Sequence, residues 1–327
     1  MSAATAGLLV TGFFGGCLVS TAVGGAVSER LARGPLYFVS VGLLLVGMGV
    51  LALPNAWPVP LVAVAVAGLG FGGLVLIINT VMAAHGVSYV NLVNGTYGLG
   101  AAAGPALISL THGGWLFAVL GVGILVSLPL VIRAPESAAV TGRLRPSLVL
   151  GLFCLLLFCY AGIETGLSSW EALHLRAHGY SADTAAALTS LFWLGLAAGR
   201  LLVPLFTKSW APPRIILTAL AACVGGLLLI TVAVSAPVGF FLLGMFAGPI
   251  FPSVLAWIAA TLPNPRRVNA FVLTTAMLGN ASVPAVIGFG LDATSPLALP
   301  AFVVTPLAGC AAIVLWLRSR ARVSSDQ

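Results

Sequence analysis

Charge is what this sequence has least of. Only 6% of its 327 residues are Asp, Glu, Lys or Arg, and lysine occurs once, at Lys208. Soluble domains carry roughly 25% charged residues, so the composition excludes a soluble protein. Acidic residues are scarcer than basic ones, with seven against fourteen. A carboxylate inside an apolar stretch is therefore a rare feature of this chain and a natural place to look for function.

Other absences remove whole functional classes. The sequence contains no HExxH motif, no phosphate-binding loop and no Ser/His/Asp set, so we expect neither an enzyme nor an ATPase that drives primary transport. Basic residues are spread over several loops, whereas nucleic-acid binding requires one basic face. The five cysteines all lie in apolar runs without metal-ligand spacing. We therefore expect no metal site and no cofactor.

What the chain does contain is long apolar runs. Hydrophobic residues make up 60% of it, and a helix that crosses a bilayer needs about 20 of them in a row. Eleven runs meet this condition, near residues 5–27, 36–54, 58–84, 91–111, 114–132, 147–173, 182–206, 214–234, 236–262, 268–291 and 297–318. These runs use nearly all residues, so the predicted fold class is an all-α integral membrane protein in contact with the lipid bilayer.

An internal repeat organises these runs. Residues 11–110 and 190–289 align without a gap at an offset of 179, which pairs Phe13 with Phe192 and Gly16 with Gly195. Repeats of helical hairpins in one membrane chain are typical of transporters built from two like halves. The run 147–173 has no partner, because its partner would precede residue 1. We expect two five-helix sets related by a pseudo-two-fold axis, with this unpaired helix lining a central cavity.

The basic residues predict the topology. They lie in alternate connections, which the positive-inside rule places in the cytoplasm together with the C-terminus. We expect an N-terminal bundle over residues 1–134, a cytoplasmic linker over 135–146, a C-terminal bundle over 147–318 and a tail over 319–327. Eleven spans then put Met1 outside. Two explanations remain open, a further helix upstream of Met1 or a protein that works with eleven, and the repeat favours the first.

Four segments then resemble a known family. Residues 25–33 are similar to the loop that follows the second helix of major facilitator superfamily proteins, and segments 160–170, 191–200 and 244–252 resemble the seventh, eighth and tenth helices of its fucose permease-like, sugar:proton symporter-like branch. The resemblance implies two helical bundles whose first helix has no counterpart here. Where that branch often carries an acid four residues before an Asn, this chain has Val75 before Asn79, which leaves proton coupling open.

Glu164 is the main site candidate, because it is the one carboxylate well inside a predicted span. A charge at mid-membrane costs about 2.5–3.5 kcal/mol on insertion scales, so such residues usually face a cavity or a partner. On a 100° helical wheel, Tyr160, Ser168 and Glu171 share its stripe. We expect Glu164 to carry a proton or bind substrate, with a structural hydrogen-bonded Glu as the alternative.

The remaining candidates fall into two groups. Trp170 is interpreted as a stacking platform for a sugar ring or as an interface residue, and the substrate or interhelical hydrogen-bonding candidates are Asn79, Asn94, Tyr97 and Asn280. A cytoplasmic gate motif is expected at Gly25, Glu29, Arg30, Arg33 and Arg200.

Three hypotheses about function follow. The first is a secondary active transporter that moves a small polar solute, a sugar in the main reading, by alternating access, with protons as an open second partner through Glu164. The second is an efflux antiporter for an amphipathic molecule, since residues 100–105 partly match an antiporter signature. The third is a non-transporting membrane protein or truncated remnant. A lysine-poor, arginine- and alanine-rich composition indicates a bacterium, hence a multi-pass protein of the inner membrane. Oligomeric state is left unassigned.

Overall fold

The computed structural model describes residues 3–27, 33–53, 56–85, 93, 96–104, 107, 147–207, 209–262 and 265–323. Its helices are α1 (Ala3–Val27), α2 (Arg33–Leu51), α3 (Val59–His85), α6 (Leu148–Ala177), α7 (Ala182–Leu188), α8 (Ser190–Phe206), α9 (Pro212–Leu229), α10 (Ala236–Ala247), α11 (Ile250–Thr261), α12 (Pro265–Ala293), the 3-10 turn η1 (Pro296–Ala298) and α13 (Leu299–Val323). Residues 96–104 are also helical.

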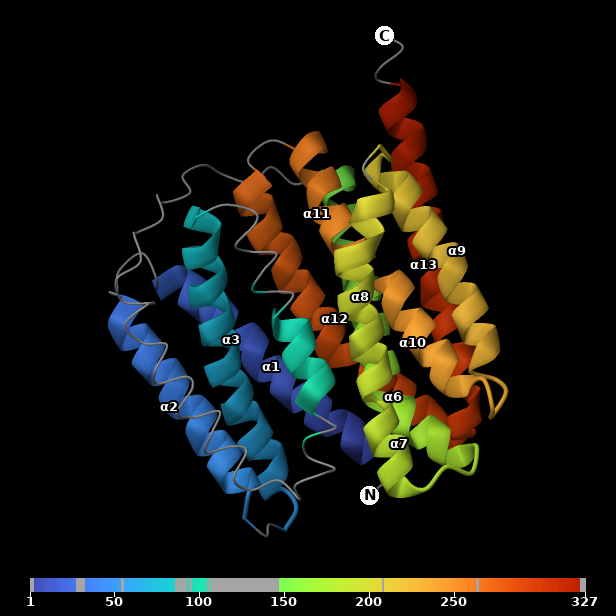
Figure 1. The fold of residues 1–327 in the computed structure, drawn as a ribbon. Helices are drawn as coiled ribbons and strands as arrows, with labels where there is room; N and C mark the ends of the chain where they lie inside the picture. Colours follow the sequence, from blue (N-terminus) through green and yellow to red (C-terminus); the bar gives the residue numbers. More distant parts are fainter. Residues whose placement is uncertain are drawn as a thin grey trace.

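These helices confirm the predicted all-α membrane class. Within the described ranges, nine stretches are long and apolar enough to cross a bilayer, and each falls on one of the eleven predicted spans. The span predicted at 91–111 is described only in part, and the one at 114–132 lies outside the described residues. The helix α1 begins and α13 ends at opposite ends of the bundle (Figure 1), as an odd number of crossings requires.

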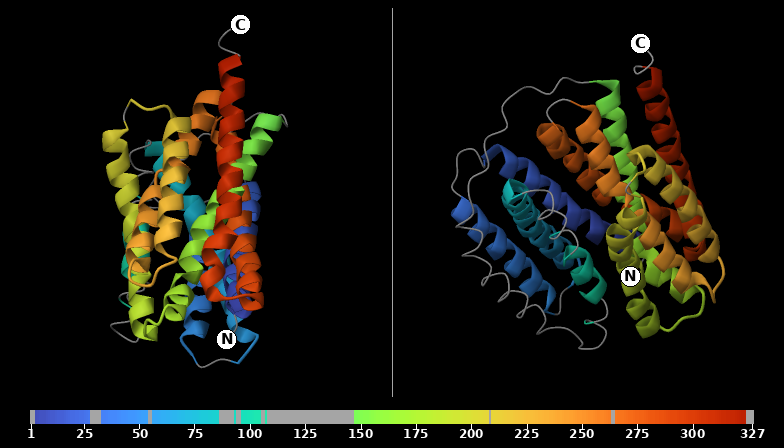
Figure 2. Two further views of the ribbon diagram at one scale, coloured as in Figure 1. Left: turned by 90° about the vertical axis from the view of Figure 1, so that its right-hand side faces the viewer. Right: turned by 45° about the horizontal axis from the view of Figure 1, so that its top comes forward.

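Two separate cores divide the helices into two bundles. The smaller core is formed by α2 and α3 around Tyr37, Val41 and Ile77. The larger one is formed by α6 to α13, with Phe153 and Phe192 among its fully buried members. Figure 2 shows α1, α2 and α3 lying together to one side of the second-half helices. Large exposed side chains such as Val62 and Leu228 cover the outer faces, where lipid replaces water as solvent.

The helix bounds reproduce the internal repeat. Adding 179 to the bounds of α1 gives 182–206, the combined extent of α7 and α8, and adding it to those of α2 gives 212–230, where α9 spans 212–229. The same shift takes α3 to 238–264, the region of α10 and α11. Packing follows too, since α1 packs on α3 as α8 packs on α10. The two pseudo-symmetric bundles predicted from the sequence are confirmed.

Glycines set the close approach of these helix pairs in both copies. A Cβ placed on Gly68 would lie 2.0 Å from the carbonyl oxygen of Phe13, and one on Gly244 would lie 2.0 Å from that of Phe192. Phe13 and Phe192 are themselves repeat mates. Only a residue without a side chain lets the backbones meet this closely, which is how membrane helices gain packing energy when lipid is as apolar as the helix surface. We call the Gly68–Phe13 and Gly244–Phe192 contacts the glycine seams.

Small residues also join the two bundles. Helix α1 of the first half packs along α12 of the second, where Thr11 donates a hydrogen bond to the carbonyl oxygen of Ala281. A Cβ on Gly7 would lie 3.0 Å from the Cα of Ala285. Helices α1 and α12 therefore bring the backbones of the two bundles into close contact.

Helix α6 is the longest of the described helices, and its ends are well defined. The Ser147 side chain accepts a hydrogen bond from the Leu150 amide and so caps the first turn. At the other end Gly179 adopts φ +97°, the left-handed conformation that commonly terminates helices. Thirty residues at 1.5 Å each give a length of about 45 Å, so a residue near its middle lies deep in a bilayer.

Candidate functional site

Glu164 lies near the middle of α6 and forms an ion pair with Arg200 of α8. The distance from its Oε2 to Nη2 of Arg200 is 3.6 Å, and each side chain is 17% exposed. The two charges are thus largely removed from water but still reachable by it. A carboxylate at this depth needs a compensating cation, and Arg200 supplies one from a neighbouring helix. The sequence also placed Arg200 in the cytoplasmic gate motif, and in this conformation its guanidinium pairs with Glu164.

Tyr160 links this pair to a third helix. It lies one turn before Glu164 on α6, is buried, and its hydroxyl contacts Glu164 Oε2. The same hydroxyl lies 2.9 Å from the carbonyl oxygen of Ala247, the last residue of α10. One phenol oxygen therefore joins the carboxyl of Glu164 to the end of α10.

The end of α10 follows from two prolines. Pro249 and Pro252 have no N–H, so the carbonyls of Met245 and Gly248 lose the partners they would have in a continuous helix. The chain accordingly breaks into α10 and α11 around Gly248 and Pro249. Ala247 lies at this break, where its carbonyl oxygen meets the Tyr160 hydroxyl. We call Glu164, Arg200, Tyr160 and the Ala247 carbonyl the α6–α8–α10 cluster.

Tyr97 brings the first half of the chain close to this cluster. Its ring centroid lies 6.2 Å from that of Phe71 on α3 and 6.2 Å from that of Trp193 on α8. The charges of both Glu164 and Arg200 act on its hydroxyl. Tyr97 is exposed, so one aromatic face from the first bundle remains accessible beside an ion pair from the second.

Three other predicted residues make structural contacts. Ser168 donates to the carbonyl oxygen of Thr165 in its own helix, and Asn280 of α12 accepts a hydrogen bond of 2.8 Å from the Thr165 hydroxyl. Trp170 is 3% exposed and its Nε1 donates to the carbonyl oxygen of Pro284. In this conformation Asn280 and Trp170 join α6 to α12. The Trp170 ring offers no accessible face.

The other predicted positions fall on parts that the structure describes incompletely. Asn94, Glu29 and Arg30 lie outside the described residues. Gly25, Arg33 and Asn79 belong to helices α1, α2 and α3, but the surroundings of their side chains are not described. The cytoplasmic gate motif therefore stays a prediction.

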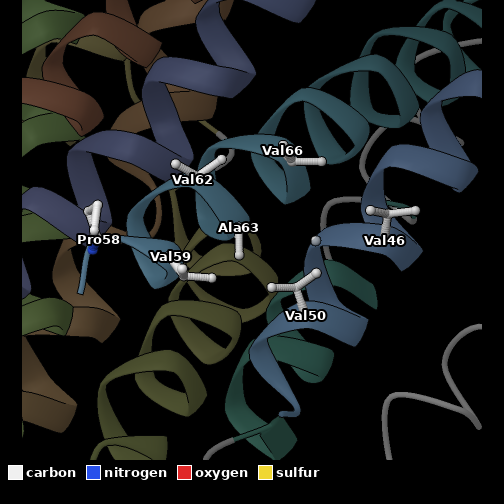
Figure 3. A pocket seen from close by; sticks show the side chains of 8 residues that line it. Val46, Val50, Pro58, Val59, Val62, Ala63 and Val66 are labelled. Atoms are coloured by element: carbon white, nitrogen blue, oxygen red, sulfur yellow. The ribbon is translucent and has the colours of Figure 1, made fainter. Parts of the chain in front are cut away.

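An apolar groove lies far from this chemistry. It has a volume of about 340 Å³ between α2 and α3, and Figure 3 shows its valines from both helices. Its lining is wholly apolar, and Val46 and Val62 are exposed on the outer face. Such a groove suits lipid chains better than a polar solute. Among the described residues, no three His, Cys, Asp or Glu side chains form a group that could hold a metal ion.

Two kinds of signal were missed in the sequence. Arg200 could have been recognised as a partner of Glu164, because it follows the close-packing pair Gly195 and Gly199 inside an apolar run and such cations pair within the bundle. Glu171 and His174 are both fully buried, although Glu171 was expected only to share the stripe of Glu164. No spacing rule in the sequence predicts their burial, because it depends on how the ends of α9 and α12 fold over α6.

Comparison with known proteins agrees with this architecture. The model of the Major Facilitator Superfamily matches residues 1–238. The glucose/mannose transporter GlcP of Bacillus subtilis (strain 168) is 23% identical over 314 residues, covering 86% of this chain and 77% of that protein. Among solved structures, the nucleoside transporter NupG superposes with a TM-score of 0.74 at 9% identity, covering 98% of this chain and 91% of its own. The E. coli fucose:proton symporter FucP gives 0.68 at 17% identity, with 96% and 90% covered. At these identities the two structures show the fold alone.

Proposed function

Because this chain belongs to the Major Facilitator Superfamily, we propose that it is a secondary active transporter that carries a sugar by alternating access, with Glu164 as the proton-coupling residue. The observation that carries the proposal is the α6–α8–α10 cluster. It combines an ionisable carboxyl, a guanidinium and a phenol deep in the membrane, and its charged members remain partly reachable by water.

A sugar fits the chemistry beside the cluster. Carboxylate and guanidinium groups bind hydroxyls with charge-assisted hydrogen bonds, and an aromatic face stacks on the C–H face of a sugar ring. Tyr97 provides such a ring within electrostatic range of Glu164 and Arg200, and its ring packs edge-on against that of Trp193. The name of the similar protein GlcP, a glucose/mannose transporter, supports the same class of solute.

The single hydroxyl hydrogen of Tyr160 suggests how protonation of Glu164 would change the contacts within the α6–α8–α10 cluster. A phenol has one hydrogen, and the Ala247 carbonyl can only accept. Tyr160 can therefore bond Ala247 and Glu164 together only when a protonated Glu164 is the donor toward it. An ionised Glu164 instead takes the Tyr160 hydrogen and attracts Arg200. Proton uptake would thus release Arg200 of α8 and tie Tyr160 to the break between α10 and α11.

Transport into proteoliposomes tests the proposal. We expect the purified protein to accumulate one of glucose, mannose, fucose or xylose when an inward proton gradient is imposed, with a nucleoside as the comparison solute. Glu164→Gln should abolish gradient-driven accumulation yet retain solute exchange, because the amide keeps the shape of the carboxyl and cannot release a proton. Asp183→Asn is a matched control, since it removes an exposed carboxylate of α7.

Other results would redirect the proposal. Equal loss of accumulation and exchange in Glu164→Gln would make Glu164 a substrate ligand with no part in coupling. Outward movement of an amphipathic compound against a proton gradient would favour the efflux antiporter. A protein that moves none of the solutes in either direction would contradict transport itself.

A further inference from the structure

A second group of titratable side chains lies at the end of α6 nearest α7, away from the α6–α8–α10 cluster. It comprises Glu171, His174 and His178, spaced three and four residues apart and so on one face of the helix. Glu171 is 0% exposed and His174 is 1% exposed. The transport proposal uses none of the three.

The bonds of His174 define its protonation. Its Nδ1 lies 2.9 Å from the carbonyl oxygen of Pro296, at the start of η1, and its Nε2 lies 2.8 Å from that of Ile230, just after α9. Carbonyl oxygens only accept hydrogen bonds, and a neutral imidazole has one N–H. Both bonds can form together only if both ring nitrogens carry hydrogen, which makes His174 an imidazolium ion.

A buried imidazolium needs a negative charge nearby, and Glu171 is placed to provide it. Neither carboxyl oxygen of Glu171 has a hydrogen-bond partner among the described residues. A buried carboxyl without a partner is costly in either form, and its ionised form is the costlier. One turn separates it from His174 on the same face, a spacing at which a carboxylate would offset the charge of an imidazolium without direct contact.

Among the described residues, no other ionisable group near this end of α6 is better placed than Glu171 to balance the charge of His174. Tyr180 already donates to the carbonyl oxygen of Ala233, and Asp183 of α7 and Asp292 of α12 are exposed. Arg176 is exposed on the far side of α6 from His174. On α9, Arg214 lies at the opposite end of the helix, and the described residues of α10 and η1 have no ionisable side chain.

We propose that Glu171 and His174 form a proton-binding site, separate from Glu164, that holds one proton on His174 and thereby fastens α6 to the end of α9 and the start of η1. His178 connects the site to solvent. Its ring centroid lies 4.8 Å from that of His174, its Nε2 lies 3.0 Å from the same Ile230 oxygen, and it is only half-buried. When the proton leaves, one ring nitrogen of His174 faces a carbonyl oxygen with a lone pair, and one of the two fastening bonds is lost.

Nitrogen-15 NMR of histidine-labelled protein in micelles tests the site directly. The chain has four histidines, and His174→Gln identifies the His174 signals by their loss. We expect both ring nitrogens of wild-type His174 to be protonated at about pH 7, and only one in Glu171→Gln, where the counter-charge is gone. A neutral wild-type His174 at that pH would overturn the proposal, and so would an imidazolium that persists unchanged in Glu171→Gln. Neither readout depends on transport, so failure of the function proposed above would leave this test intact.

A stability measurement separates the site from a merely buried acid. If Glu171 were only an unpartnered carboxyl, Glu171→Leu should raise the melting temperature, because an apolar side chain of similar size removes the cost of burial. A proton-binding pair gives the opposite sign. The variant should melt lower than wild type at about pH 6, and the difference should shrink toward about pH 9 as the charge pairing is lost. A melting temperature equal to or above wild type at every pH would contradict the pairing.

Discussion

Helix α3 and its repeat mate, the pair α10 and α11, differ at two positions with large consequences. At the offset of 179, Gly70 corresponds to Pro249 and Gly73 to Pro252. Glycine keeps the backbone N–H, so α3 runs unbroken from Val59 to His85, whereas the prolines break its mate between Ala247 and Ile250. The same scaffold is continuous in one half and interrupted in the other.

A second difference lies on the neighbouring helices. Thr21 of α1 corresponds to Arg200 of α8 at the same offset. The Thr21 hydroxyl donates within its own helix, to the carbonyl oxygens of Cys17 and Leu18, while Arg200 reaches across to Glu164. In the described residues, duplication has preserved the packing of both halves, and the second half alone carries the broken helix and the ion pair.

The largest effect is expected at the glycine seams, which allow the same close packing in both halves although Gly68 and Gly244 are not themselves repeat mates. Gly68→Val and Gly244→Val should each lower stability by about 3 kcal/mol, because the added Cβ would lie 2.0 Å from a carbonyl oxygen and the helices must separate. Melting temperature and yield of monodisperse protein measure this. Gly42→Ala and Gly225→Ala are controls, since a Cβ there meets open space in each half. If one seam tolerates valine while the other does not, the equivalence of the copies is lost.

A smaller effect should separate Arg200 from its mate. Arg200→Thr, which installs the residue of the first half, should reduce transport at least tenfold, because Glu164 loses a charge-assisted interaction worth about 1.5–3 kcal/mol. Thr21→Ala removes only a bond within one helix and should leave the transport rate unchanged. Initial rates of uptake measure both. Comparable losses in the two variants would mean that Arg200 acts through packing alone.

The prolines give a third comparison. The double variant Pro249→Gly and Pro252→Gly copies the pattern of α3 and restores the two missing N–H groups. We expect α10 and α11 to join into one helix, with stability changed by no more than about 1 kcal/mol because added hydrogen bonds oppose added chain entropy. Hydrogen exchange should show protected amides at positions 249 and 252. Rapid exchange at both positions would indicate that tertiary packing, and not proline, holds the break open.

The smallest effect concerns Trp170. Trp170→Phe removes the hydrogen bond to the Pro284 carbonyl and should cost about 1 kcal/mol, measured as a modest fall in melting temperature. The KM for solute should stay unchanged, because the ring is buried between α6 and α12. A raised KM without a fall in melting temperature would return Trp170 to the role of a sugar platform.

The fold could be predicted from the sequence to a large extent, because bilayer solvation leaves few choices. Apolar run length gives the helices, and the offset of 179 gives their pairing, since backbone groups in lipid must bond within their own helix. The break at Pro249 also follows from chemistry that is visible in the sequence. Helix bounds consequently agree to within a few residues where the structure describes them.

The candidate site could be predicted only in part. Glu164 stands out because a mid-span carboxylate is rare. Its partner Arg200 comes from a helix 36 positions further on (200 − 164). Counting helical turns along the predicted span 182–206 places Arg200 nearer the cytoplasm than Glu164. A long, flexible arginine side chain can span that difference. Asn280 and Trp170 show why two roles stayed open for such residues, since polar atoms that suit a substrate suit a neighbouring helix equally well.

The glycine seams limit which changes in length the gene can accept. One residue inserted into α3 before Gly68 would rotate the remainder of that helix by about 100°, turning the glycine from Phe13 and presenting a side chain in its place. Insertions in the connecting loops have no such effect. Selection should therefore remove indels from within the paired helices while tolerating substitutions there, which explains how two copies can diverge to separate roles and still align over 100 residues without a gap.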